Sequence, residues 1–339
     1  MEIRMLDVAE KAGVSKTTVS HVINNTRPVA SLTRQRVLEA VRSLGFYKDA
    51  HARSLTRGSS DFFGLIISDI QNPFFPEIIK GFETAAVEQG LDMLLCATSY
   101  DPNRTQAAVR VMLENKVRGV AIMTSQIGPE LGEELTSHEV PIVFLDVERA
   151  RRLRSTIVLD YAQGLREAVA HLSELGHRDF ALIAGAASRR ASLIYRAAYT
   201  TVLGEFGLSP EVIVDGNQTV EGGAVAARLL LDRPAVPTAI ICQNDLTAIG
   251  AINAFHAAAV RVPEDISVVG CDDIYCAPFI SPPLTTVNLF RLSLGHLAFQ
   301  ALQKISRTKR RSGKRYTGEC HLVVRNSTAP ARTSSLHLC

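Results

Sequence analysis

The sequence lacks the segments that mark exported and membrane-spanning proteins. No positively charged stretch followed by an apolar core opens the chain, so we see no secretory signal. No uncharged apolar run approaches the roughly 20 residues that a membrane helix needs. The 339 residues are 46% hydrophobic and 21% charged, which suffices for two or three domains with buried cores. We expect a soluble, cytoplasmic protein with no membrane partner.

Cysteine is sparse and scattered. The six cysteines form no CxxC pair and no Cys/His cluster with the spacing of a zinc site. Cys271 and Cys276 are the closest pair, but neither a histidine nor a second pair lies near them in the sequence. We therefore expect buried free thiols and no metal site.

The motifs of common enzyme classes are also missing. The chain contains no GxxxxGK[ST], GxGxxG, HExxH or GxSxG motif. Asp272 and Asp273 follow a predicted strand and should point to opposite sides, so spacing alone does not make them an acid–base pair. The sequence therefore predicts a protein that binds rather than reacts, with no catalytic residues and no cofactor.

Positive charge is concentrated at the N-terminus. Residues 1–60 contain ten Lys or Arg and five Asp or Glu, a net charge of +5, whereas the whole chain is +3 and the remaining 279 residues are −2. A basic segment on a near-neutral body favours a polyanionic partner over a solvated tail. A second basic run, SRTKRRSGKRYTG at 306–318, is more simply interpreted as a solvated loop than as another nucleic-acid patch.

Three short helices are predicted in this basic segment. The first begins at Leu6 and ends at Gly13, which can stop a helix. The second runs from about Lys16 to Asn24, capped by Ser15, with Val19, Val22 and Ile23 facing inward. The third stops at Gly45. We expect Ser31 or Thr33 to cap it, and its inner side to consist of Val37, Leu38, Val41 and Leu44.

Two helices joined by a tight glycine turn and braced by a third are typical of a helix-turn-helix. Its second helix enters the major groove of DNA. Lys16, Thr17 and His21 are the candidates for base edges, because lysine donates to guanine and threonine contacts the thymine methyl. A small helical bundle with a solvated polar face is the alternative. The candidate phosphate contacts are Ser15, Ser20, Asn24 and Arg27.

The segment 48–60, KDAHARSLTRGSS, connects this head to the rest of the chain. It is too short to hold a helix alone in water, and its last three residues are typical of a flexible linker. Two interpretations stay open. It is an ordinary interdomain tether, or it folds on docking and places Leu55 as an apolar wedge between base steps in the minor groove.

From Phe62 onward, apolar β-type runs alternate with helical patterns. The pattern repeats as two consecutive α/β units, each expected to form a doubly wound parallel sheet with helices on both faces. Ligands of such sheets bind beyond the carboxyl ends of the strands. Those ends carry residues 69–75, Asn244–Asp245 and Asp272–Asp273. Facing strand ends of two lobes would make a binding cleft.

Together these segments resemble the LacI/GalR (lactose-repressor) family of transcription regulators, and the match covers nearly the whole chain. Matching stretches of the head are LDVAEKAGVSKTTVSHVINNTRPV, RVLEAVRSLGF and AHARSL. In the body they are GLIISDIQNPFFPEIIKGFETAA, NDLTAIGAINA, VPEDISVVGCDDI, PPLTTV and LVVRNSTAP.

The resemblance implies an N-terminal helix-turn-helix at 1–47, a hinge helix and linker at 48–60, and a two-lobed domain like a periplasmic sugar-binding protein at 61–339. It implies lobe one at about 61–159 and 289–320, and lobe two at about 160–288 and 321–339. The family binds palindromic operators as homodimers, with a tetramer allowed, and repression is its commoner mode. Carried over, the hinge leucine is Leu55, with Ala52 and Arg53 beside it, and the base-reading positions are Lys16, Thr17 and His21.

The resemblance also implies a sugar-like small-molecule effector between the lobes. The matching positions are Asn72, Phe75, Asp245 and Asp272, an aromatic face and carboxylates that suit a polyol. The family's pocket arginine falls on Tyr195, one step before Arg196. Either an extra loop residue lets Arg196 enter the pocket, or Tyr195 has replaced that arginine.

Smaller departures from the family pattern are Gln218 where an aromatic is common, Lys48 in place of a hinge proline, and Ala30-Ser31 in place of Ser-Pro. Two other function classes compete with the regulator. One is a solute-binding protein used in transport. The other is a sugar-acting enzyme with a fused helix-turn-helix.

Overall fold

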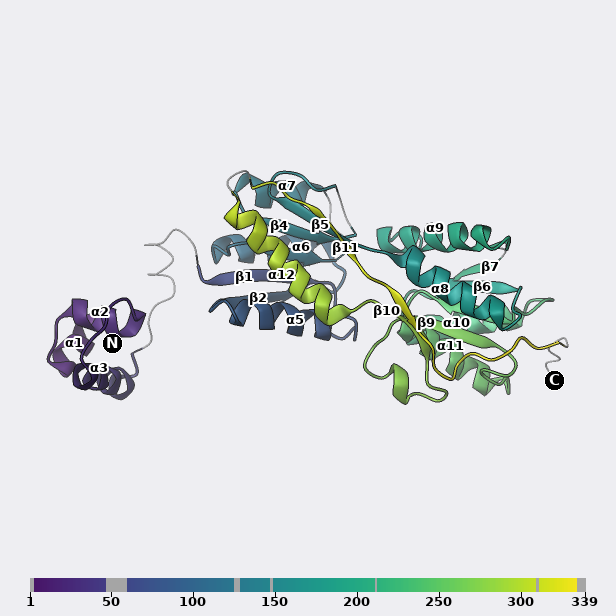
Figure 1. The fold of residues 1–339 in the computed structure, drawn as a ribbon, viewed down its shortest axis with the longest axis horizontal. Helices are drawn as coiled ribbons and strands as arrows, with labels where there is room; N and C mark the ends of the chain where they lie inside the picture. The colour runs from purple at the N-terminus through teal and green to yellow at the C-terminus, as the bar shows by residue number, and fades with distance from the viewer. Residues whose placement is uncertain are drawn as a thin grey trace. The chain divides into compact units, whose positions relative to one another are not determined.

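The computed structural model describes residues 3–46, 60–124, 129–146, 149–210, 212–308 and 311–333. The chain divides into two compact units, residues 1–60 and 61–339, here called the head and the body. Each is drawn in Figure 1. Within the described residues, no helix combines the length and the apolar character needed to cross a membrane.

The head consists of three helices around a small apolar core. They are α1 (Met5–Ala12), α2 (Lys16–Asn24) and α3 (Ser31–Leu44). Gly13 and Gly45 end α1 and α3 in the left-handed conformation, at φ of 64° and 62°, which a residue without a side chain adopts easily. The predicted helices and both glycine stops are therefore confirmed. The core consists of Val8, Ala9, Ala12, Val19, Val22, Val37 and Ala40.

Two details of α3 correct the expectation. Neither Ser31 nor Thr33 caps the helix, because it begins one residue earlier than a Ser31 cap requires, and Ala30 occupies the cap position without a side-chain hydrogen bond. Leu38 is not on the inner side: it is 38% exposed, and Ala40 takes the inward position instead.

The first lobe of the body is a six-stranded parallel sheet in the order β11-β5-β4-β3-β1-β2. Adjacent residues of β1 alternate between faces. Leu65 and Ile67 pack on the core that includes α5 and α12, whereas Ile66 packs with α6 and α7. The elements are β1 (Phe62–Ile67), α5 (Phe75–Val87), β2 (Asp92–Ala97), α6 (Pro102–Glu114), β3 (Val120–Met123), α7 (Pro129–Ser137), β4 (Ile142–Leu145), β5 (Arg154–Leu159), α12 (Arg291–Arg307) and β11 (Arg315–Gly318).

The second lobe is another six-stranded sheet, in the order β12-β10-β9-β8-β6-β7. Helices α8 and α9 cover one face, and α10 and α11 cover the other. The elements are α8 (Tyr161–Glu174), β6 (Phe180–Ala184), α9 (Arg190–Glu205), β7 (Val212–Asp215), α10 (Val220–Leu231), β8 (Ala239–Cys242), α11 (Asp245–Ala257), β9 (Ser267–Asp272), the 3-10 helix η1 (Ala277–Phe279), β10 (Thr285–Asn288) and β12 (His321–Val323).

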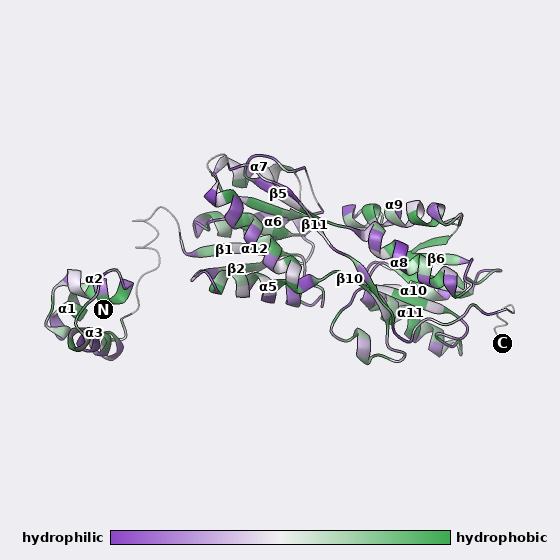
Figure 2. Ribbon diagram, in the orientation of Figure 1, coloured by the Kyte–Doolittle hydropathy of each residue, from purple (hydrophilic) through white to green (hydrophobic). Residues whose placement is uncertain are grey.

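The predicted doubly wound, two-lobed body is confirmed, with two corrections at its edges. Strand β12 pairs antiparallel with β10, so the second sheet is not purely parallel. The basic run at 306–318 is not all loop, because Arg315–Gly318 forms β11 on the edge of the first sheet beside β5. The chain passes between the lobes after β5, after β10 and after β11. Figure 2 shows that hydrophobic residues dominate the strands and hydrophilic ones the outer parts of the helices.

Helix α12 returns to the first lobe and packs closely on α5 at two glycines. A Cβ on Gly81 would lie 2.1 Å from the Leu292 carbonyl oxygen, and a Cβ on Gly295 would lie 2.1 Å from that of Ile78. Neither distance is tolerable, so only glycine lets the two helices approach this closely. The late helix is thereby fixed to the first lobe, although lobe-two residues precede it in the chain.

The cysteines are free thiols in the described part of the chain. Cys242, Cys271 and Cys320 are buried, whereas Cys96 and Cys276 are half-buried. Burial raises the pKa of the Cys320 thiol to about 12, so this thiol is neutral at physiological pH. The described residues include no group of three or more His, Cys, Asp or Glu placed to hold a metal ion.

Candidate functional site

Helix α2 presents a polar surface from the head, and its start is tightly capped. The Thr18 backbone N–H donates to Ser15 Oγ at 3.1 Å, and the two side-chain oxygens lie 2.9 Å apart. An Arg36 guanidinium from α3 donates to the carbonyl oxygen of Ala12, where α1 ends. These contacts fix the turn between α1 and α2 and so fix the direction of the second helix.

Seven of the residues predicted to contact DNA lie in α2 or close to its ends, and none of them is buried. Ser15, Lys16, Thr17 and Arg27 are exposed, and Ser20, His21 and Asn24 are half-buried. Three of these polar side chains are held by short local bonds, which limit their rotamers. His21 Nδ1 lies 2.8 Å from Thr26 Oγ1, and Asn24 Nδ2 donates to Ser20 Oγ at 3.0 Å.

The structure does not reach the predicted hinge. Ala52, Arg53 and Leu55, together with Lys48, lie outside the described residues, so the two interpretations of the linker stay predictions.

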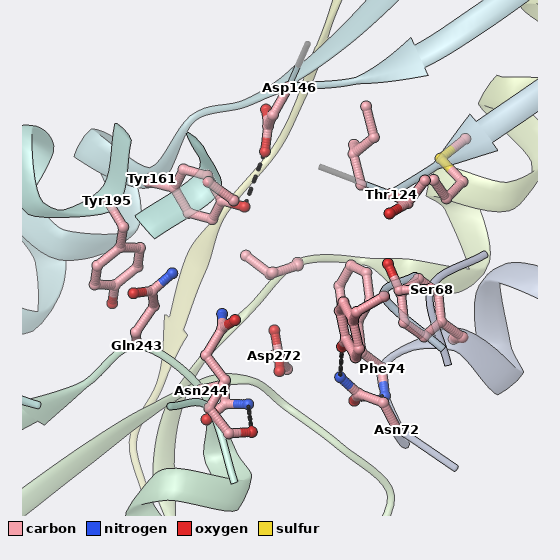
Figure 3. A pocket seen from close by; sticks show the side chains of 17 residues that line it. Ser68, Asn72, Phe74, Thr124, Asp146, Tyr161, Tyr195, Gln243, Asn244 and Asp272 are labelled. Carbon is pink, nitrogen blue, oxygen red and sulfur yellow. Dashed lines mark hydrogen bonds between the residues drawn. The ribbon is translucent and has the colours of Figure 1, made fainter. Parts of the chain in front are cut away.

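A cavity lies in the body between the carboxyl ends of the parallel strands of the two sheets. It encloses about 720 Å³ of empty space, part of it open to solvent. Figure 3 shows Asn72, Phe74 and Thr124 of the first lobe facing Tyr195, Gln243 and Asn244 of the second. Pockets of this size at the junction of two lobes are typical small-molecule sites. The lining is Ser68, Asn72, Phe74, Phe75, Tyr100, Met123, Thr124, Leu145, Asp146, Tyr161, Ala191, Tyr195, Gln218, Gln243, Asn244, Asp272 and Leu289.

Several lining residues have a strained backbone. Tyr100, Asp146, Gln218 and Asp272 adopt φ of 59°, 54°, 60° and 117°. Non-glycine residues rarely occupy this region, and each instance costs of order 1–3 kcal/mol. Such strain persists where the surrounding structure fixes it, often at ligand sites, so the strand ends are held in shape before any ligand arrives.

Four of the six residues predicted for the effector pocket line the cavity: Asn72, Phe75, Tyr195 and Asp272. The other two, Arg196 and Asp245, do not. Tyr195 is buried in the cavity wall, with its ring edge-on to Tyr161 at 5.3 Å between centroids. Of the two arrangements left open by the sequence, the structure therefore has Tyr195 at the pocket position.

Arg196 and Asp245 are absent from the cavity lining for different physical reasons. Arg196 does not line the cavity: it donates to the Gly185 carbonyl oxygen at 2.9 Å and forms an ion pair with Asp215. Asp245 is fully buried beneath the cavity and accepts hydrogen bonds from Thr286 Oγ1 at 2.5 Å and the Ile274 backbone N–H at 2.8 Å. Burial raises the pKa of Asp245 to about 7. Both side chains therefore hold the second lobe together.

Sequence reasoning missed most of the aromatic and polar lining. Asp146 comes directly after β4 and Gln243 directly after β8, at the carboxyl ends of the predicted strands PIVFLD and TAIICQND, so the strand-end rule could have found them. Tyr161 and Tyr100 gave no such signal, because Tyr161 opens α8 and Tyr100 lies in the turn after β2. Tyr100 is brought to the cavity by its contact with Asn72, whose Nδ2 lies 3.5 Å from the tyrosine hydroxyl.

Two buried carboxylates face the cavity and differ in their surroundings. Asp146 accepts from the Leu159 backbone N–H and from the Tyr161 hydroxyl, each at 2.9 Å. Burial nevertheless raises the pKa of Asp146 to about 6. Burial also raises the pKa of Asp272 well above its usual range, reinforced by the neighbouring Asp245 charge and opposed by Arg291. Its sequence neighbour Asp273 points elsewhere and pairs with Arg325 at 2.6 Å.

Models of known protein families match both the head and the body. Residues 4–49 match the model for bacterial regulatory proteins of the lacI family. Residues 169–328 match the model for periplasmic binding protein-like domains.

Individual proteins match over nearly the whole length. The HTH-type transcriptional regulator DegA of Bacillus subtilis is 34% identical over 98% of this chain and 100% of its own. The HTH-type transcriptional repressor PurR of Vibrio atlanticus is 34% identical over 95% of this chain and 97% of its own.

Solved structures also match over nearly the whole chain. A Lac repressor dimer bound to operator and the anti-inducer ONPF is 27% identical, with a TM-score of 0.86 over 97% of this chain and 100% of that one. A complex of the transcriptional regulator CelR with cellobiose is 29% identical, with a TM-score of 0.72 over 96% of this chain and 99% of that one. With its capped helix-turn-helix and its two-lobed body, this chain belongs to the LacI family of bacterial regulatory proteins, which are transcriptional regulators and not enzymes.

Proposed function

We propose that this regulator is a cytoplasmic repressor that binds a palindromic operator as a homodimer. The ligand in the cavity of the body controls the affinity for that operator. The observation that carries the proposal is the presence, on one chain, of an exposed polar helix in a basic head and a separate preorganised cavity in the body. The Lac repressor relative is a dimer bound to operator, and the CelR relative is bound to cellobiose, which supports both halves.

The proposed DNA contacts are assigned from the exposure of the side chains on and around α2. Lys16 and Thr17 occupy the exposed first turn of α2, where side chains reach base edges, and His21 lies one further turn along the helix. Ser15, Ser20, Asn24 and Arg27 surround them and are proposed to contact phosphates. Ala52, Arg53 and Leu55 are proposed to act in the minor groove at the operator centre.

The family assignment favours the regulator over the two competing functions, a solute-binding protein and a sugar-acting enzyme with a fused helix-turn-helix. Repression rather than activation is proposed because the PurR and Lac relatives are named repressors. Asn72, Phe75, Tyr195 and Asp272 are the proposed effector contacts.

Binding of the full chain to an operator selected from random DNA tests this proposal. Affinity should fall by roughly 10³-fold or more between about 50 and 200 mM salt if about 6–10 phosphates are contacted. Lys16→Ala should weaken binding by about 1–3 kcal/mol and relax the sequence preference. Lys11→Ala, at the exposed end of α1, is the matched control and should cost less. A salt-independent affinity, or equal effects of the two variants, would contradict the proposal.

A further inference from the structure

In the described part of the chain, the cavity wall contains acidic side chains and no basic ones. None of the 17 lining residues is a lysine, arginine or histidine, whereas Asp146 and Asp272 are acids. The sequence segments 125–128 and 147–148, which adjoin lining residues but lie outside the described part, contain no lysine or arginine either. A ligand in this cavity therefore meets two acidic side chains and, among the described residues, no lining cation that could balance them.

The arginines near the cavity do not line it and already have partners, although the partners of Arg189 are two lining residues. Arg189 donates to Gln218 Oε1 at 3.0 Å and stacks over the Tyr100 ring, with its guanidinium carbon 4.6 Å from the ring centroid. Arg196 is paired with Asp215. Arg291 is 3% exposed and bonds to the backbone oxygens of Pro73 and Asp273, with Glu77 Oε2 at 3.2 Å. Arg190 exerts only a small charge effect on Asp146.

Asp272 is the acid without a partner. Its side chain accepts no hydrogen bond from the described residues, and the residue is only 8% exposed. Figure 3 shows it at the centre of the cavity, between Asn244 and Phe74. A buried carboxylate without compensation is costly, so it takes up a proton or a cation. Asp146, by contrast, already holds two hydrogen bonds.

The remaining wall is aromatic. Phe74, Phe75, Tyr100, Tyr161 and Tyr195 all line the cavity, and their rings offer apolar faces that also attract cations. The Tyr195 hydroxyl is buried beside the Cys271 thiol and makes no standard hydrogen bond. Such a wall suits a ligand with a flat ring better than a flexible ligand with an acidic group.

We propose that the effector is a ring-bearing small molecule with a protonated amino group, which pairs with the Asp272 carboxylate while the ring packs among the aromatic side chains. The inference rests on the proposed function, since it names the ligand class of the same cavity. Phosphorylated and carboxylate-bearing ligands are disfavoured because no lining cation would receive them. A neutral polyol can donate hydroxyl hydrogen bonds to Asp272 but brings no positive charge to balance the carboxylate, so it should bind less tightly than its amino counterpart.

Calorimetric titration of the full chain with matched compounds tests the ligand class. The probes are glucose with glucosamine and glucose 6-phosphate, galactose with galactosamine and galactose 6-phosphate, and cyclohexanol with cyclohexylamine. At least one amine should bind about tenfold or more tightly than its hydroxyl counterpart, as a charge-assisted bond gives. Asp272→Asn should remove most of that preference. Asp92→Asn makes the same charge change at an exposed position and should retain it.

The pH dependence supplies a second readout. Since burial raises the pKa of Asp272 and a cation favours its ionised form, amine binding should release protons, and the affinity for the amine should rise with pH as long as the amine stays protonated. The groups facing Asp272 that set this titration are Asp245, which disfavours ionisation, and Arg291, which favours it.

Tighter binding of neutral or phosphorylated members, absence of binding by every amine, or an unchanged preference in Asp272→Asn would overturn the ligand class. Salt-dependent binding to selected operator DNA would persist in that event. Loss of DNA binding in the unmodified chain would instead contradict the proposed function.

Discussion

Which of two neighbouring residues, Tyr195 or Arg196, lines the cavity decides whether the cavity wall contains a positive charge. On a helix, neighbouring residues point about 100° apart, so a residue count that is uncertain by one in the preceding loop exchanges an inward side chain for an outward one. The sequence therefore left Tyr195 and Arg196 as alternatives. The structure has Tyr195 in the wall and Arg196 on Asp215, which removes the arginine that would have balanced Asp272.

Asp272→Asn should change stability in a pH-dependent way. Because burial raises the pKa of Asp272, the stability associated with this group is greatest at low pH and is lost as pH rises through the folded-state pKa. The asparagine variant should therefore melt near the parent temperature at about pH 4 and above it at about pH 8. A gain of roughly 2–4 °C for each kcal/mol relieved is expected in thermal melts of the full chain. An equal shift at both pH values would contradict this account of Asp272.

Elements with strong apolar patterns were predictable, and those set by tertiary contacts were not. The runs FGLII and FALIA are buried and β-rich, so β1 and β6 follow from their sequences. Strand β11 contains Arg315, Tyr316, Thr317 and Gly318 and becomes a strand only because β5 offers an open edge. Strand β12 has three residues and depends likewise on β10. The cavity was predictable as a place at the strand ends, but its aromatic wall was not.

The two serines at the starts of α2 and α3 should differ in their contribution to stability. Ser15 accepts a bond from the Thr18 N–H, so Ser15→Ala should cost about 0.5–2 kcal/mol in the opening of the head. Ser31 is the first helical residue after an Ala30 cap and makes no capping bond, so Ser31→Ala is the matched control and should cost little. Amide hydrogen exchange of α2 and α3 in the full chain would measure both. Equal costs would show that Ser15 does not act as a cap.

Two glycines in helices should respond oppositely to alanine. Gly81→Ala puts a Cβ against the Leu292 backbone and should destabilise the body by about 1–3 kcal/mol through overpacking between α5 and α12. A methyl group on Gly204, in α9, would meet no described atom within 4 Å beyond its own stretch of helix, so Gly204→Ala should stabilise by up to about 1 kcal/mol. Chemical denaturation of the full chain distinguishes the two. Stabilisation by Gly81→Ala would mean that the helices are free to separate.

At the scale of the whole molecule, the chain joins a basic head to a body whose lobes meet around a strained, acidic, aromatic cavity. Because the chain passes between the lobes at three connections, after β5, β10 and β11, a ligand that changes how the lobes meet acts on all of them at once. Coupling to DNA requires different ligand affinities in the DNA-binding and released states, typically worth about 1–3 kcal/mol. The strained strand ends are the points at which such a difference can arise.

The most direct test of the central claim is selection of DNA from a random library by the full chain, followed by sequencing of the bound fraction. The account predicts enrichment of one sequence made of two inverted half-sites, as a two-fold dimer reading DNA through α2 requires. It also predicts that Lys16→Ala relaxes the preference within each half-site. Binding without enrichment of any sequence, or enrichment of a single unrepeated half-site, would contradict it.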